Sequence, residues 1–341
     1  MKQVWIPKAG PPEILEVREA PDPAPKAGEV RVRVSAAGIN FADTSARIGM
    51  YPDAPPFPCV VGYEASGVID AVGEGVDAAR VGERVLVLTR FGGYASVLCV
   101  PSLQAAPMPE AMSFEEAAAL PVVYLTAHHM LVYLGNVKAR DTVLIHAAAG
   151  GVGLAALQLC KHIGAKTIGT ASASKHEYLK KAGLDHAIDY NTQDFEAEVK
   201  RITDGRGVDI ALDAQGGESV AKSLRSLAPT GRVFAFGAAS LQPEGKKNVF
   251  SAIGGLLGFP LMPLHPIRLM NDNRGIFGVN VGHLWGEVPL LREQLDALVK
   301  LYEAGAIKPV IDSTFGFSKA AEGHRRLLER RNIGKVLLLP D

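Results

Sequence analysis

A short glycine-rich turn constrains the fold of this chain more than any other feature. The apolar run 142–146 is followed by the seven residues AAAGGVG (147–153), which lead into the apolar helical pattern LAALQL (154–159). A buried strand, a tight turn and a helix in this order form the arrangement by which an α/β sheet binds the pyrophosphate of a dinucleotide. The same string also suits the start of a helix that binds nothing, so the segments downstream decide between the two.

The small residues of the turn predict contact with phosphate groups. Gly150 and Gly151 let the backbone approach the phosphates, and Gly153 lets the helix press against the strand. The N–H groups of the first helical turn then face the anion, and the helix dipole favours its negative charge. Ala148 stands where the G-x-G-x-x-G pattern has its first glycine. We expect Ala148, Gly150, Gly151, Val152 and Gly153 to contact the cofactor.

The residues after the turn alternate between strand-like and helix-like segments. Ser174 and Glu177 have the spacing of a capping box, which predicts a helix that ends at Gly183, and Asp194 predicts the start of another. Six strands separated by helices indicate a doubly wound parallel sheet with right-handed crossovers. The predicted strands are 142–146, 166–170, 187–190, 208–213, 232–237 and 276–281.

The two ends of the chain have a different pattern. Residues 29–34 alternate strictly between charged and apolar side chains, and 68–73 and 84–88 continue this β pattern. Near the C-terminus, a helix is predicted to stop at Gly305, and residues 336–339 are expected to form a final strand. The apolar face of that helix is marked by Leu291, Leu295, Leu298 and Tyr302.

These patterns predict an α/β protein with two domains. We expect a mostly β domain over residues 1–120, a nucleotide-binding domain over 121–282, and a return to the first domain over 283–341. A dinucleotide turn combined with a separate β domain predicts hydride transfer to a substrate.

Composition excludes several kinds of partner. The 341 residues include 36 Lys plus Arg and 36 Asp plus Glu, so no nucleic acid or anionic membrane is expected as a partner. The 3 cysteines are far apart and odd in number, which fits a reducing cytoplasm better than a disulfide framework. Prolines and glycines interrupt the apolar stretch Val249–Met270, which predicts a pocket wall, a lid or a subunit contact and no membrane span.

Several motifs resemble those of a known family. They are GINFADT (38–44), GYEASG (62–67), the glycine turn and NIGKVLLLP (332–340). With them the chain resembles the zinc-free medium-chain dehydrogenase/reductases over essentially its whole length. The segments GTASASKHE (169–177), IDY (188–190) and IKPVIDS (307–313) look most like the branch that holds quinone oxidoreductases and vesicle amine transport protein homologues. The resemblance implies a GroES-like β domain, a Rossmann domain and a homodimer joined through the last Rossmann strand.

The resemblance also indicates that no metal is bound. Zinc alcohol dehydrogenases have a cysteine where this chain has Asn40, and a histidine where it has Tyr63. An amide or a neutral phenol replaces thiolate or imidazole poorly as a zinc ligand. Only Cys99 lies in the region where those relatives carry four structural cysteines. We therefore expect neither a catalytic nor a structural zinc ion.

The end of the second Rossmann strand predicts NADPH as the cofactor. NAD-selective domains end this strand with an acidic residue, whereas here Ser172 follows it and no acid occurs before Glu177. Zinc-free quinone reductases use a serine, a lysine and a tyrosine for the 2′-phosphate, which correspond to Ser172, Lys175 and Tyr190. An ordinary polar start of a helix is the alternative explanation.

Further cofactor contacts follow from the resemblance. Thr126 is similar to a threonine that contacts the nicotinamide amide, and Asn332 and Lys335 come from the C-terminal motif. Adjacent helical residues such as His128 and His129 point about 100° apart, so this pair does not predict a metal site. The remaining expected contacts are Gly237, Phe277 and Val279, in or near the last two Rossmann strands.

Without a metal, the favoured acceptors are small apolar carbonyl compounds that delocalise the incoming hydride themselves, such as quinones and activated enones. Asn40 offers an amide donor, and by resemblance it also lies at the nicotinamide end of the cofactor. Asp43 either orients the substrate or caps a helix, and Tyr63 either donates a hydrogen bond or packs beneath the cleft. Ser45 replaces a tyrosine of many quinone reductases, and Tyr51 is a possible substitute.

Two other functions remain open from the sequence. The first is an enoyl-thioester or enone reductase that uses the same cofactor with a different substrate. The second is a non-catalytic nucleotide-binding protein, because crystallin-like and vesicle-associated relatives occur in this group.

Overall fold

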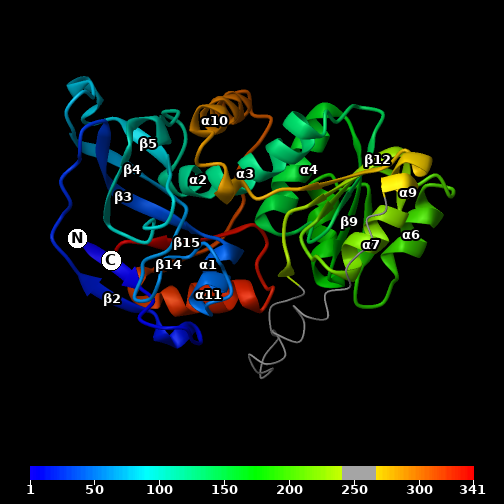
Figure 1. The fold of residues 1–341 in the computed structure, drawn as a ribbon, viewed down its shortest axis with the longest axis horizontal. Coiled ribbons are helices and arrows are strands. Elements are labelled where there is room, and N and C mark those ends of the chain that lie inside the picture. The colour runs from blue at the N-terminus through cyan, green and yellow to red at the C-terminus, as the bar shows by residue number, and fades with distance from the viewer. Residues whose placement is uncertain (240–265) are drawn as a thin grey trace. The chain divides into compact units, whose positions relative to one another are not determined.

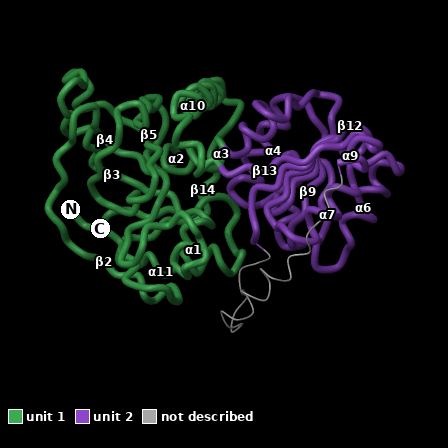
Figure 2. Tube along the Cα trace, in the orientation of Figure 1, with its two compact units in different colours: residues 1–125, 281–341 green, residues 126–280 purple. Residues whose placement is uncertain are grey.

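The glycine turn joins a strand to a helix, as the sequence predicts. In the computed structural model, which describes residues 1–239 and 266–341, strand β8 (Thr142–Ile145) leads into the turn and helix α4 (Gly151–Ile163) follows it. Two compact units make up the chain: unit 1 contains residues 1–125 and 281–341, and unit 2 contains residues 126–280 (Figure 2). Most of the apolar stretch Val249–Met270 lies outside the described residues.

Unit 2 is built on a parallel sheet, in which Figure 1 labels β9 and β12. Its described strands have the order β10-β9-β8-β11-β12-β13. This order reverses its direction between β8 and β11, which is the topological switch point where open α/β sheets bind ligands. Each of the six predicted strands has a counterpart, so the predicted doubly wound sheet is confirmed. Besides β8, the strands are β9 (Lys166–Ala171), β10 (His186–Asp189), β11 (Val208–Asp213), β12 (Leu227–Ala235) and β13 (Gly275–Gly278).

Helices alternate with these strands. They are α5 (His176–Lys181), α6 (Phe195–Ile202), α7 (Glu218–Arg225) and α9 (Pro266–Asp272), in addition to α4. The Asp194 side chain accepts a hydrogen bond from the Ala197 N–H group at 3.0 Å, so the predicted start of α6 is confirmed. No described helix is both long enough and apolar enough to cross a lipid bilayer.

Several predictions at element ends are wrong. Ser174 does not cap α5, because a 3₁₀ helix (Ala173–Lys175) precedes that helix and the Ser174 hydroxyl lies 3.2 Å from the Ser172 hydroxyl. The fifth and sixth strands also end before the predicted positions, at Ala235 and Gly278. Gly237 and Val279 therefore lie in the connections that follow the carboxyl ends of β12 and β13.

Unit 1 contains a mostly antiparallel sheet of the order β14-β15-β3-β4-β5-β7, with β6 paired to β3. The C-terminal strand β15 lies between β14 and β3, so both ends of the chain contribute to one sheet. The strands are β3 (Glu29–Ile39), β4 (Glu64–Val72), β5 (Arg84–Leu88), β6 (Val97–Pro101), β7 (Ala105–Pro107), β14 (Ile311–Gly316) and β15 (Lys335–Leu339), and β1 (Lys2–Trp5) and β2 (Glu16–Glu19) form a separate hairpin.

Alternation along the strands of unit 1 builds its core. Val30, Val32 and Val34 of β3 are buried, as the strict alternation of residues 29–34 predicts, and each buried valine contributes about 1.5–3 kcal/mol. The predicted apolar face of helix α10 (Val288–Glu303) is confirmed for Leu291, Leu295 and Leu298, which are buried, whereas Tyr302 is only partly buried. The helices of this part of the chain are α1 (Phe41–Arg47), α2 (Phe114–Ala119), α3 (Pro121–His128), α10 (Val288–Glu303) and α11 (Ala320–Leu328).

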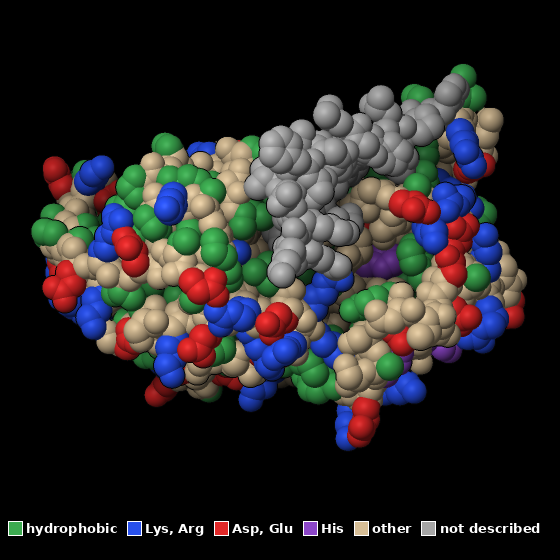
Figure 3. Space-filling model, turned by 90° about the horizontal axis from the view of Figure 1, so that it is seen from below, with side chains coloured by type: hydrophobic (Ala, Val, Ile, Leu, Met, Phe, Trp, Pro, Cys, Tyr) green, Lys and Arg blue, Asp and Glu red, His purple; other side chains and the backbone are tan. Residues whose placement is uncertain are grey.

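Charged side chains of both signs are interspersed on the described part of the face shown in Figure 3. This agrees with the equal totals of basic and acidic residues in the sequence.

Candidate functional site

The glycine turn of unit 2 has the backbone geometry of an anion-binding loop. Ala147 has a positive φ of 52°, and the Gly150 N–H group donates to the Ala147 carbonyl oxygen at 2.8 Å, which closes the turn. A Cβ atom added at Gly153 would lie 2.4 Å from the Ala147 oxygen and 2.6 Å from the Ala148 oxygen. Position 153 therefore requires glycine for the close approach of helix and strand.

Helix α4 offers N–H groups at its start. Gly150 is its N-cap, and the N–H groups of Gly151, Val152 and Gly153 have no acceptor within the helix itself. A helix of 13 residues also places a partial positive charge at this end. The turn lies beside the topological switch point, so its geometry suits a pyrophosphate group.

The three residues expected at the 2′-phosphate lie at one edge of the sheet. Strands β9 and β10 are parallel and pair Ala171 with Asp189, so Ser172 and Tyr190, which follow them, are neighbours at the carboxyl ends of these strands. Lys175 lies in the 3₁₀ helix after β9 and is partly exposed, and Tyr190 is exposed.

Asp189 places a carboxylate at this edge of the sheet, and its oxygens already accept hydrogen bonds from neighbouring residues. Its oxygens accept hydrogen bonds from the Asn191 N–H group at 3.1 Å and from the Thr192 hydroxyl at 3.2 Å. These hydrogen bonds lower the pKa of Asp189, the Asn191 backbone bond most. The carboxylate thus organises its own loop, and β9 itself ends at Ala171, with Ser172 after it.

The other expected cofactor contacts of unit 2 lie in different surroundings. A Cβ atom added at Gly237 would lie 2.6 Å from the Ala214 carbonyl oxygen, so the chain passes closely over the end of β11. Val279 is buried, whereas Phe277 on β13 is 39% exposed and stacks on Phe234 at 5.2 Å between ring centroids. Thr126 lies half-buried in α3.

A buried network that the sequence did not predict anchors the strands beside the switch point. His146 follows β8, and its Nε2 lies 3.0 Å from the Ser223 hydroxyl, which lies 2.8 Å from Asp213 at the end of β11. Its Nδ1 lies 3.1 Å from the Thr170 hydroxyl. Burial lowers the pKa of His146, so the ring is neutral.

The network does not form a hydrolytic triad. Serine lies between the histidine and the aspartate, whereas a triad requires histidine in the middle to take the proton of the serine. Ser223 and Asp213 are both completely buried, so no substrate reaches the hydroxyl. The signal that could have indicated it is a polar residue at the end of each of two apolar runs, His146 after β8 and Asp213 as the last residue of β11.

Unit 1 contains a buried cluster around Asn40, the N-cap residue of α1. The Lys335 ammonium lies 2.5 Å from the Asn40 Oδ1 and 2.5 Å from the Glu64 Oε1, and the Asn40 Nδ2 group donates to the same Glu64 oxygen at 2.9 Å. Asn40 is 8% exposed, Lys335 4% and Glu64 0%. The structure thus brings two predicted residues, Asn40 and Lys335, into direct contact, and Glu64, which was not predicted, contacts both.

Sheet register creates this cluster. Strand β15 pairs Val336 with Ile39, which places Lys335 beside Asn40 at the end of β3. Glu64 begins β4 beside Gly38, where an added Cβ atom would lie 2.3 Å from the Glu64 Oε1. Glycine at position 38 therefore makes room for the buried carboxylate.

The remaining Glu64 oxygen is also satisfied. Its Oε2 accepts a hydrogen bond from the Val122 N–H group at 2.7 Å, at the start of α3. Because both oxygens have partners and the carboxylate contacts an ammonium, the buried charge is compensated. A lone acidic residue within an apolar strand, as in GYEASG, is the signal that could have indicated it.

Asp43 caps helix α1 and ties it to neighbouring segments. Its carboxylate accepts hydrogen bonds from the Asn40 N–H group at 2.7 Å, the Gly62 N–H group at 3.0 Å and the Tyr94 hydroxyl at 3.1 Å. Complete burial outweighs these bonds and raises the pKa of Asp43 to about 7. The capping role is therefore present in the structure, and any contact with a substrate remains a prediction.

A directed chain of hydrogen bonds continues from Asp43. Arg47 can only donate, so at 2.9 Å it fixes the His324 Nδ1 as an acceptor, and the His324 Nε2–H group then donates to the Tyr94 hydroxyl at 3.2 Å. Burial and the neighbouring guanidinium lower the pKa of His324 to about 3, which keeps the ring neutral. Burial also lowers the pKa of Arg47 to about 10. None of these three residues was predicted.

Tyr63 lies buried in an aromatic group. Its ring is 4.9 Å from that of Phe91 and 6.3 Å from that of Tyr51, measured between centroids. Burial and the Tyr51 hydroxyl raise the pKa of Tyr63 far above its usual value, so its hydroxyl keeps its proton. Tyr51 is thus beside Tyr63, whereas the Ser45 hydroxyl donates to the Phe41 carbonyl oxygen within α1.

Asn332 organises the turn before β15. Its Nδ2 group donates to the Gly334 carbonyl oxygen at 2.8 Å, and the residue is buried. Gly334 has a φ of 91°, and this turn positions the start of β15, where Lys335 lies.

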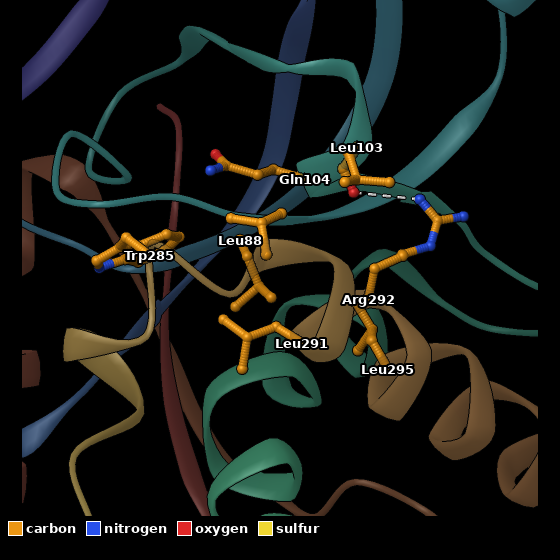
Figure 4. A pocket seen from close by; sticks show the side chains of 8 residues that line it. Leu88, Leu103, Gln104, Trp285, Leu291, Arg292 and Leu295 are labelled. Atoms are coloured by element: carbon orange, nitrogen blue, oxygen red, sulfur yellow. Dashed lines mark hydrogen bonds between the residues drawn. The ribbon is translucent and has the colours of Figure 1, made fainter.

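A small hollow lies elsewhere in unit 1, beside α10. It is lined mainly by Leu88, Leu103, Trp285 and Leu291, and the Arg292 guanidinium donates to the Leu103 carbonyl oxygen at its rim (Figure 4). Its volume of about 10 Å³ is at the limit for one water molecule, so it does not suit an organic substrate.

Comparisons with known proteins identify the family. Residues 26–110 match the alcohol dehydrogenase GroES-like domain, and residues 182–338 match the family described as zinc-binding dehydrogenase. The synaptic vesicle membrane protein VAT-1 homolog of Rattus norvegicus is 46% identical over 327 residues, which are 96% of this chain and 80% of that protein.

Solved structures give the same result. The human synaptic vesicle membrane protein VAT-1 homolog-like protein has a TM-score of 0.86 and 33% identity, over 100% of this chain and 98% of that chain. The Escherichia coli quinone oxidoreductase complexed with NADPH has a TM-score of 0.86 and 32% identity, over 100% of both chains.

A GroES-like β domain combined with a Rossmann domain defines the medium-chain dehydrogenase/reductases. The chain belongs to this superfamily, in the branch of VAT-1 homologues and quinone oxidoreductases. The predicted fold class and the family resemblance are both confirmed.

The residues around Asn40 do not fit a zinc ion, although the matched family is described as zinc-binding. Amide and phenol groups stand at two ligand positions, and the nearby Glu64 carboxylate is already paired with the Lys335 ammonium. Within residues 1–239 and 266–341, no three His, Cys, Asp or Glu side chains come together in a way that could hold a metal.

Proposed function

We propose that this chain is an NADPH-dependent oxidoreductase that reduces a quinone or another α,β-unsaturated carbonyl compound without a metal ion. The observation that carries the proposal is the anion-binding turn at the switch point, together with a β9 end that lacks an acid and has Ser172, Lys175 and Tyr190 beside it. The similarity to a quinone oxidoreductase that was solved with NADPH supports it.

Unit 2 binds the nucleotide in this proposal. The N–H groups of Gly151, Val152 and Gly153 receive the pyrophosphate, and Ser172, Lys175 and Tyr190 receive the 2′-phosphate. Gly237, Phe277, Val279 and Thr126 contribute further contacts. NADPH, when bound, supplies the hydride, and the protein supplies orientation and electrostatics.

Unit 1 prepares the acceptor. The second Nδ2 hydrogen of Asn40 donates to the acceptor oxygen, on which negative charge develops as the hydride arrives. Tyr63 keeps its proton at neutral pH and offers a second donor. Asp43 fixes the backbone of Asn40 through the cap of α1. Because no metal polarises the acceptor, only acceptors with strong delocalisation are expected to react.

Two measurements test the proposal. Fluorescence titration with NADPH and with NADH gives the two affinities, and loss of NADPH absorbance with a panel of quinones, enones and enoyl thioesters gives turnover. We expect tighter binding of NADPH and turnover with quinones or enones. Tight binding without turnover on any acceptor would favour a non-catalytic nucleotide-binding protein, and turnover with enoyl thioesters alone would favour the enoyl reductase.

A cytoplasmic homodimer is part of the same proposal. Strand β13 lies at the edge of the described sheet, and an edge strand can pair with a second copy. Analytical ultracentrifugation should give twice the mass of the chain, and a monomer at all concentrations would contradict this part alone.

A further inference from the structure

We infer that the buried Lys335–Glu64 ion pair is a positioning device that fixes the side-chain amide of Asn40 in one orientation and strengthens its free N–H group as a donor. The inference rests on the proposed function for its chemical meaning. It assigns to Lys335 an action through Asn40 instead of a direct contact with the cofactor, and it adds Glu64 to the site.

The donor and acceptor chemistry of the two partners determines the orientation of the amide. An ammonium can only donate, so the oxygen of Asn40 must face Lys335, and a carboxylate can only accept, so the nitrogen must face Glu64. A flipped amide would place oxygen against carboxylate and NH₂ against ammonium, and both contacts would be repulsive. The orientation is therefore fixed by chemistry as well as by geometry.

This orientation leaves one N–H group of Asn40 for a ligand. The amide nitrogen carries two hydrogens, and the contact with Glu64 uses one of them. Asn40 is 8% exposed, which is more than Lys335 or Glu64, so it is the least enclosed member of the cluster.

The ion pair also polarises this amide. The positive charge at 2.5 Å from Oδ1 draws electron density from the nitrogen, and hydrogen-bonded chains of this kind strengthen one another in a medium of low dielectric constant. The ammonium thereby makes the Asn40 N–H group a stronger donor to a developing oxyanion. It takes a role that a Lewis acid has in the zinc enzymes, one residue removed from the substrate.

A buried pair of this kind needs a reason beyond stability. Replacing a buried ion pair by well-packed hydrophobic side chains of similar volume often leaves stability unchanged or increases it. Here Glu64 is 0% and Lys335 4% exposed, and both contact Asn40, the residue that stands where zinc dehydrogenases have a cysteine. Apolar side chains could not hold the amide of Asn40 in one orientation, because they offer neither a donor nor an acceptor.

A double-mutant cycle tests the inference. Asn40→Ala should lower kcat/KM by about 100-fold, as expected for loss of an oxyanion donor, and Lys335→Met should lower it by about tenfold or more. In the Asn40→Ala background, Lys335→Met should have almost no further effect, because the lysine acts through the asparagine. Equal losses in both backgrounds would overturn the inference. If Lys335→Met does not fold, the variant Lys335→Met/Glu64→Gln, which removes both charges, takes its place in the cycle.

NMR of the protein without cofactor gives a second measurement, with selectively ¹⁵N-labelled asparagine. The side-chain amide of Asn40, assigned by its loss in Asn40→Ala, should exchange slowly and have one proton shifted downfield. Both features should disappear in Lys335→Met/Glu64→Gln, and their persistence would contradict the inference even if no acceptor is turned over. Failure of the proposed function would show itself separately, as absence of turnover by the wild type.

The matched control is Lys308→Met. Lys308 also pairs with a glutamate in unit 1, Glu116 at 3.4 Å, but its side chain is 78% exposed. Turnover and the Asn40 amide signal should both remain as in the wild type. A loss equal to that of Lys335→Met would mean that the effect is one of general charge.

Discussion

The two units bury polar networks of opposite character. In unit 1, Lys335, Glu64, Arg47 and Asp43 place charged or ionisable groups in the interior, with at most 4% exposure. In unit 2, the network around His146 joins a neutral ring and hydroxyl groups to a single carboxylate. The glycine turn of unit 2, where we propose that the pyrophosphate binds, offers backbone N–H groups instead of side chains.

The difference indicates two ways of building a site. The nucleotide turn is formed by residues close in sequence, and its requirement is steric: small side chains and one tight turn. The cluster in unit 1 is formed by residues up to 295 positions apart, and its requirement is electrostatic: each buried charge needs its partner. The following variants test whether the two sites fail in these different ways.

The largest effect is expected in the charged cluster. Glu64→Gln leaves the Lys335 ammonium buried without a countercharge, which should cost about 3–5 kcal/mol of unfolding free energy. The double variant Glu64→Gln/Lys335→Met should recover most of this loss. Urea unfolding followed by circular dichroism measures both.

The control for this prediction is an exposed pair. Glu177→Gln breaks the contact with Lys181, whose side chain is 76% exposed, and should change stability by less than about 0.5 kcal/mol. A double variant as unstable as Glu64→Gln alone would mean that the buried charge is not the cause.

In the glycine turn, we expect substitutions to lower stability through steric clashes. Gly153→Ala places a Cβ atom 2.4 Å from a carbonyl oxygen of the backbone, so the turn must shift, at a cost of about 1–3 kcal/mol. Gly150→Ala meets its nearest atom, the Ala147 oxygen, only at 3.2 Å and should cost less. Thermal unfolding without cofactor compares the two, and equal losses would contradict the steric explanation.

Asp43 gives unit 1 a pH dependence. Its pKa of about 7 in the folded state lies above its usual value of 3.8, so the folded state binds more protons between these values. Its contribution to stability is fully present below about pH 4 and is lost as the pH rises through about 7. Relative to Asp43→Asn, the wild type should therefore lose up to about 1.4 kcal/mol per pH unit in this range. If the unfolding free energies of the wild type and of Asp43→Asn changed in parallel between pH 4 and pH 8, this prediction would be contradicted.

The smallest effect is expected at the edge of the nucleotide site. Lys175 is partly exposed, so Lys175→Ala should weaken NADPH binding by at most about 1 kcal/mol and leave NADH binding unchanged. Lys181→Ala, farther along α5, is the control for general charge and should affect neither cofactor. Equal weakening of NADPH and NADH by Lys175→Ala would remove the lysine from recognition of the 2′-phosphate.

Local patterns predicted much of unit 2 and part of unit 1. The strands around β11 and the buried face of α10 follow from apolar periodicity, which depends only on neighbouring residues. The predicted cap at Ser174 is wrong because residues 173–175 form a 3₁₀ helix before α5. The free energies of a 3₁₀ turn and of a capped α-helical start differ little, so a local pattern does not decide between them. Short edge elements such as β1, β2 and β7 have too few residues for a periodic signal.

The sequence by itself determined the nucleotide turn, the alternation of strands and helices, and the presence of Asn40 and Tyr63 at positions where zinc enzymes have ligands. Sterics and periodicity act over a few residues, so a single stretch of sequence is enough to express them. Only the tertiary structure decided that Glu64 and Lys335 flank Asn40, because this depends on the register of β3 with β4 and with β15. The sequence does not show which residue neutralises a buried charge, because the partner comes within hydrogen-bonding distance only when the strands pair.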